Sequence, residues 1–110
     1  MPAQSGLLGQ VAPGATTLTD LYTVPADMKA LVKVIITNRA AETTFRIAAA
    51  SGGELVSNKQ YIAYDKQIDS YDTGSTIEFW IGAGDKVRVY AASANLSFTC
   101  TGQEEYITNG

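Results

Sequence analysis

The sequence predicts an all-β fold, a single antiparallel β-sandwich of jelly-roll or Greek-key type with about seven to eight strands. Three observations predict it. Apolar and polar residues alternate in short stretches, turn-forming residues separate these stretches, and no stretch repeats apolar residues at the period of a helix. The chain of 110 residues has the length of one domain. We place the sandwich at residues 16–107, after an irregular arm at residues 1–15.

The arm is rich in Gly, Pro, Ala and Gln and shows no periodicity. Leu7, Leu8 and Val11 are its apolar residues, so we expect it to pack either on its own domain or on a neighbouring molecule. It has no positively charged residue ahead of an apolar stretch, and we therefore do not expect a signal peptide.

After the arm, each alternating stretch has one apolar and one polar face, as expected for an antiparallel sheet packed on a core. In residues 75–81, this alternation places Ile77, Phe79 and Ile81 on the apolar side and Trp80 on the polar side. Residues 54–72 are ambiguous, because 60–64 fits either a short strand or a helical turn. The expected strands are 17–24, 29–38, 43–49, 75–81, 86–91 and 96–101.

Composition and charge exclude several classes of function. The formal net charge is −3 and the eight Lys and Arg residues are scattered, which argues against nucleic-acid binding. The longest apolar stretch, residues 30–36, is too short to cross a membrane. The chain has no histidine, the commonest general base and metal ligand. We therefore expect no enzyme, no catalytic residue, no metal and no cofactor.

The acidic residues and the cysteine are weak candidates for metal binding, glycoside hydrolysis and thiol chemistry. Asp65, Asp69 and Asp72 share one polar stretch, but their spacing matches no calcium loop, and we expect solvated carboxylates. Glu78 and either Glu104 or Glu105 would have to converge on a cleft to act as a glycosidase pair, and nothing in their spacing indicates that. The single cysteine, Cys100, excludes an internal disulfide, fits a reducing cytoplasm, and is expected to be buried and inert.

Aromatic residues on the polar faces are the best candidates for binding. Trp80 and Tyr90 lie at polar-side positions, and Arg88 accompanies Tyr90. Such rings cover a sheet edge, anchor a protein interface or stack on sugars. We take as candidate protein-interface residues these three and the three of the arm: Leu7, Leu8, Val11, Trp80, Arg88 and Tyr90.

Three segments resemble a known family. They are LGQVAPGATTLTDLYTVPA at 8–26, QYIAYD at 60–65 and GDKVRVYAASANLSF at 84–98. Together they resemble small virion structural proteins of tailed bacteriophages and prophages, a group that includes capsid decoration (cement) proteins and tail-associated proteins. The resemblance implies no catalytic residue.

The resemblance leads us to expect a decoration protein that is assembled in the host cytoplasm and becomes part of the virion. It would bind the major capsid protein on the outer face of the assembled shell, as a homotrimer, and would stabilise the shell because it binds only the assembled state. The alternatives are a tail- or fibre-associated adaptor protein and, from another class, a carbohydrate-binding module that uses Trp80 and Tyr90.

Overall fold

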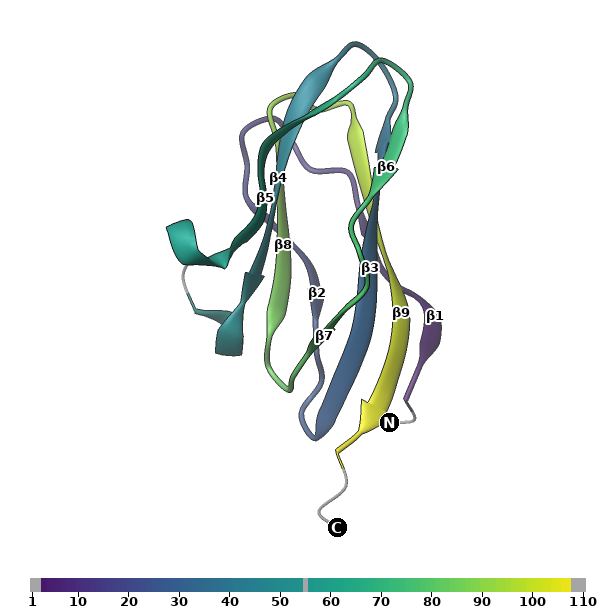
Figure 1. Ribbon diagram of the computed structural model, residues 1–110, viewed down its shortest axis with the longest axis vertical. Helices are drawn as coiled ribbons and strands as arrows, with labels where there is room; N and C mark the ends of the chain where they lie inside the picture. Colours follow the sequence, from purple (N-terminus) through teal and green to yellow (C-terminus); the bar gives the residue numbers. More distant parts are fainter. Residues whose placement is uncertain (1–2, 55, 108–110) are drawn as a thin grey trace.

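The computed structural model describes residues 3–54 and 56–107, and it confirms the predicted β-sandwich (Figure 1). Nine strands in these residues form two antiparallel sheets, which we call sheet A and sheet B. Sheet A contains, in spatial order, β1 (Ser5–Val11), β9 (Leu96–Tyr106), β3 (Met28–Asn38) and β6 (Thr73–Ser75), and β7 (Phe79–Ile81) also pairs with β3. Sheet B contains β2 (Thr19–Thr23), β8 (Lys86–Ala91), β4 (Thr43–Ala50) and β5 (Tyr61–Ile68).

The strand order is that of a jelly roll. Strands β6 and β7 pair with different parts of β3, so they form one edge strand that is interrupted at residues 76–78. Counted this way, the nine described strands become eight, in the orders β1-β9-β3-β6/β7 and β2-β8-β4-β5. This order is that of the two interlocked Greek keys of a jelly roll. Two single-turn 3₁₀ helices, η1 (Ser51–Gly53) and η2 (Asn58–Gln60), connect β4 to β5.

The core lies between the sheets and is built by strict alternation. The two central strands of sheet A, β3 and β9, are each 11 residues long and pair along their whole length. On their inner faces Val32, Val34, Phe98 and Cys100 are all 0% exposed. Because side chains of a strand alternate between faces, the residues between them point outward. The two-residue period seen in the sequence is therefore the origin of the buried core.

The first segment departs from the prediction of an irregular arm. Residues 5–11 form β1, which pairs with β9 as the edge strand of sheet A and has a bulge between Leu7 and Gly9. Leu8 and Val11 pack against the core, whereas Leu7 is 63% exposed. The sequence pattern failed here because Gly6 and Gly9 break the alternation, and pairing with β9 overrides their low strand propensity.

The region from 54 to 81 also differs from expectation. The ambiguous stretch is a 3₁₀ turn followed by β5, an eight-residue strand. The single strand predicted at 75–81 is wrong, because it is interrupted at residues 76–78 between β6 and β7, although the Thr76 N–H still donates to the carbonyl oxygen of Val34 at 2.9 Å. Ile77, which the alternation placed on the apolar side, is 83% exposed as a result.

Candidate functional site

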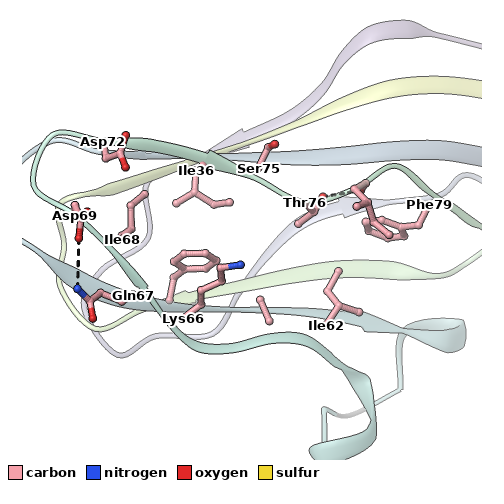
Figure 2. A pocket seen from close by; sticks show the side chains of 14 residues that line it. Ile36, Ile62, Lys66, Gln67, Ile68, Asp69, Asp72, Ser75, Thr76 and Phe79 are labelled. Atoms are coloured by element: carbon pink, nitrogen blue, oxygen red, sulfur yellow. Dashed lines mark hydrogen bonds between the residues drawn. The ribbon is translucent and has the colours of Figure 1, made fainter.

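The two edges of the sandwich differ in how closely the sheets meet. At the edge formed by β1 and β2 the sheets are in close contact, and a Cβ on Gly9 would collide with the carbonyl oxygen of Leu21. At the opposite edge, β5 of sheet B faces β6 and β7 of sheet A, and a groove of about 660 Å³ lies between them (Figure 2). We call this side, comprising β5, β6, β7 and residues 69–72 and 76–78, the open edge, and the side formed by β1 and β2 the closed edge.

The groove of the open edge is lined by apolar side chains, some of them part of the core and others exposed. Its volume lies in the range of ligand-binding clefts. Ile77 and Ile62 on its rim are 83% and 49% exposed. Folded monomers rarely expose large contiguous apolar patches, and such patches mark binding surfaces. The apolar residues that line the groove are Ile36, Phe45, Ile62, Ala63, Ile68, Ile77 and Phe79.

A lysine lies in this apolar setting. Lys66 is paired in register with Phe45 across β4 and β5, so both side chains are on the inner face of sheet B. Phe45 is 5% exposed in the core, whereas Lys66 is exposed in the groove. An inward-pointing charge on an edge strand prevents a further strand from being added there. Lys66 is thus both a barrier to sheet extension and the cation of the groove.

The loop at one end of the groove, residues 69–72, is held by a buried amide. Asn38 is 2% exposed, and its Nδ2 donates to the carbonyl oxygens of Asp69 and Ala41, each at 2.9 Å. Its Oδ1 accepts a bond from the backbone N–H of Ala40 at 3.0 Å. At the tip of the loop, Tyr71 has a φ of 58° and is 78% exposed. A non-glycine residue in this conformation is strained, and such strain persists only where the surroundings enforce it.

The outer side of β5 carries a bulge that orders a second cluster. Residues 64 and 65 together oppose Arg46 of β4, and Asp65 has a φ of 48°. This geometry places the Asp65 carboxylate 2.6 Å from Arg46 Nε and the Tyr64 ring 4.3 Å from the guanidinium carbon. Tyr90 of β8 lies on the same guanidinium at 4.6 Å. Hydrogen bonding to Asp65 raises the pKa of Arg46.

Trp80, Arg88 and Tyr90, three of the candidate interface residues, do not lie together. Trp80 is on β7 of sheet A, whereas Arg88 and Tyr90 are on β8 of sheet B. Lys29 Nζ lies 5.1 Å from the centre of the Trp80 ring. Arg88 donates to Asp20 at 2.8 Å, its side chain is 14% exposed, and this pairing lowers the pKa of Asp20. Arg88 is therefore committed to contacts within the molecule.

The other candidate sites are also accounted for by internal contacts. Asp65 pairs with Arg46, away from Asp69 and Asp72, and residues 3–54 and 56–107 contain no group of three metal-ligating side chains. Glu104 accepts bonds from the Tyr22 hydroxyl at 2.5 Å and from the Gln4 N–H at 3.0 Å, which places it at the closed edge. Glu78 lies in the break between β6 and β7, at the open edge.

Cys100 is 0% exposed, and burial raises the pKa of its thiol to about 12. It is therefore a thiol without the thiolate character that reactivity requires. The part of the chain that the structure describes contains no helix long and apolar enough to cross a membrane.

Comparison of the chain with protein-family models, with curated proteins and with solved structures finds no match.

Proposed function

We propose that this chain is a non-catalytic structural protein of a tailed-bacteriophage virion, a capsid decoration protein that attaches to the assembled shell through the open edge. The observation that carries the proposal is the apolar groove, with Ile62 and Ile77 exposed on its rim and Tyr71 exposed on the loop at its end. Tyr64 and Trp80 are also exposed but do not line the groove.

These residues have the character of a protein interface. Tyr and Trp are enriched in the buried centre of interfaces, where they carry a large share of the binding energy. The loop that presents Tyr71 is fixed by the buried amide of Asn38, so little conformational entropy is lost when a partner binds it. The proposal that the protein acts in the virion is supported by the three segments that resemble phage structural proteins.

Protein is favoured over carbohydrate as the partner because cations already occupy the aromatic rings. Lys29 lies over Trp80, and Arg46 lies over both Tyr64 and Tyr90. A sugar needs a free ring face on which to stack. At least one face of each of these rings is taken by a side chain of the same molecule, which disfavours a sugar-stacking platform.

The proposal is tested by counting the chain in purified virus particles with quantitative mass spectrometry, relative to the major capsid protein. Decoration predicts on the order of hundreds of copies, because shell sites are repeated by symmetry. A count of a few to a few dozen would indicate a tail protein and contradict decoration. Absence of the chain from particles would refute the virion role.

Two matched variants place the same charge on an exposed apolar position. Ile77→Asp places it at the open edge, and Leu18→Asp places it outside the open edge. We expect the first to lose at least about tenfold in particle occupancy and the second to bind like the wild type, since a desolvated charge in an interface is strongly penalised. Equal occupancy of the two variants would contradict attachment through the open edge.

A further inference from the structure

The groove of the open edge has a chemical polarity along its length. Figure 2 shows Asp69 and Asp72 at one end, Ile62 and Phe79 toward the other end, and Lys66 between them. One end of the groove is thus apolar without acids, its middle carries a single cation, and its other end carries two acids beside the buried Ile36 and Ile68. A surface with such an order selects what can fill it by chemistry as well as by shape.

Lys66 determines the central requirement. Among residues 3–54 and 56–107 its ammonium has no ion pair, and its side chain lies at the mouth of the core beside Phe45. An occupant that covers the groove removes water from this ammonium. Burial of a charge is strongly unfavourable unless a charge of opposite sign replaces the water. The occupant must therefore place a carboxylate beside Lys66.

The acidic end sets a complementary requirement. Asp72 accepts the backbone N–H of Thr73 at 2.8 Å, and Asp69 accepts Gln67 Nε2 at 3.4 Å. An ionised carboxylate has about four acceptor sites, so both groups retain capacity for further donors. Because these two acids are exposed, they favour a cationic group on the part of the occupant that lies against them.

The occupant is held by its side chains, and it does not extend a sheet. Strand β5 is protected by the bulge at Asp65 and by the inward charge of Lys66. The facing edge is broken at residues 76–78. Bulges, charges and short strands are the devices by which sheet edges resist the addition of another strand. A segment lying lengthwise between these edges still meets apolar residues, a cation and acids in succession.

We propose that the groove binds an extended segment of a partner protein in which an apolar residue is followed, along the groove, by an acidic residue and then by a basic one. This names the partner chemistry for the open edge and rests on the proposed function only in taking that edge as a protein-binding face. The segment binds with its apolar side chain against Ile62 and Phe79, its carboxylate at Lys66 and its cation at Asp69 and Asp72.

The probes are two capped peptides of identical composition, acetyl-Leu-Ile-Gly-Glu-Gly-Lys-amide and its charge-exchanged isomer acetyl-Leu-Ile-Gly-Lys-Gly-Glu-amide. Each is also made with the reversed sequence, because the proposal fixes the order of the side chains along the groove but not the direction in which the peptide backbone runs. Binding to the intact chain is followed by two-dimensional amide NMR. The matched variant Lys66→Glu/Asp69→Lys/Asp72→Lys inverts the charges of the groove at three exposed positions, and its spectrum reports whether the fold is kept.

For the wild type we expect the first order of charges to bind at least about fivefold more tightly, with shifts confined to the groove. The charge-inverted variant should prefer the isomer. The inference is overturned if both isomers bind equally, if the preference survives the inversion, if shifts lie elsewhere, or if neither binds at millimolar concentration. Groove shifts that grow with protein concentration alone identify a second copy as the occupant and also overturn it. If these peptides fail while Ile77→Asp still loses particle occupancy, the proposed function stands and this inference falls.

Discussion

At the scale of single residues, a few polar side chains decide how the open edge is built. Asn38 is buried, and through its amide it joins the turn after β3 to the loop that carries Asp69 and Tyr71. A buried amide is retained only where its bonds are satisfied, and no side-chain polar atom is left buried without a partner in the part of the chain that the structure describes. Lys66 is the opposite case, a charge at the mouth of the core that has no ion pair with any residue the structure describes.

Cys100 provides a residue-scale prediction in alkaline solution. Burial raises the pKa of its thiol from 9.0 to about 12, so the folded state holds the proton over a range in which the unfolded state releases it. Its contribution to stability is complete below pH 9 and is lost as the pH rises toward 12. By pH 11, two units above the pKa of the unfolded thiol, we expect the free energy of unfolding to fall by about 3 kcal/mol on this account.

The measurement is urea unfolding of the wild type and of Cys100→Ala between pH 8 and pH 11. Tyr22, whose pKa is also raised by burial and by its bond to Glu104, acts in the same direction above pH 10, so the comparison of the two proteins is the informative quantity. The wild type should lose stability more steeply than the variant. Parallel dependences of the unfolding free energy on pH for the two proteins would contradict the burial of Cys100. So would a native thiol that reacts with a disulfide reagent as fast as an unfolded one.

At the scale of elements, the two edges of the sandwich are specialised in opposite ways. The closed edge depends on a glycine that lets β1 approach β2, and the bulge beside it fits β1 onto β9. The open edge depends on interruption, with a bulge in β5 and a break between β6 and β7. Because both β5 and β6/β7 are poor templates for another strand, the groove between them remains available for side chains.

A substitution at the closed edge tests its tight packing. Gly9→Ala places a Cβ against the carbonyl oxygen of Leu21, and we expect it to destabilise the fold by about 2 kcal/mol or more. The matched control is Gly74→Ala on β6, where a Cβ meets nothing within 4 Å. Urea unfolding of both variants is the measurement. A Gly9→Ala protein as stable as the Gly74→Ala protein would refute the close contact of β1 with β2.

Regular alternation predicted most of the strands, but it missed β1, which lacks alternation, and it was wrong for residues 75–81, which alternate and are nevertheless interrupted. Residues 29–38 read as a strand because Val32, Val34 and Ile36 alternate, and β3 spans almost the same range. Strand β1 was missed because Gly6 and Gly9 interrupt its alternation. Residues 75–81 alternate throughout, so the sequence gives no sign of the interruption that exposes Ile77. The open edge was unpredictable for a further reason, since it forms where β5 and β6/β7 from different sheets face each other, which depends on strand order. The one local signal was Lys66, a charge at an inward position of β5.

At the scale of the whole molecule, the jelly roll is a rigid support in which the two sheets meet closely at one edge and leave a groove at the other. Pairing of β3 with β9 along 11 residues fixes the centre of sheet A, and the closed edge seals one flank. The apolar groove lies entirely on the other flank, together with Ile62, Tyr71 and Ile77. A surface placed at one edge of a rigid sandwich binds with little loss of internal freedom, which suits a protein that must fasten to an assembled shell.

The most direct test of this account is a cryo-EM map of purified particles at side-chain resolution. We expect the sandwich in many symmetric copies on the outer face of the shell, with Ile77 and Lys66 covered by an extended segment of a neighbouring protein and a carboxylate beside the lysine. A map in which the chain is present but the groove between β5 and β6/β7 faces solvent would contradict the open edge as the binding surface, and a map without the chain would contradict its place in the virion.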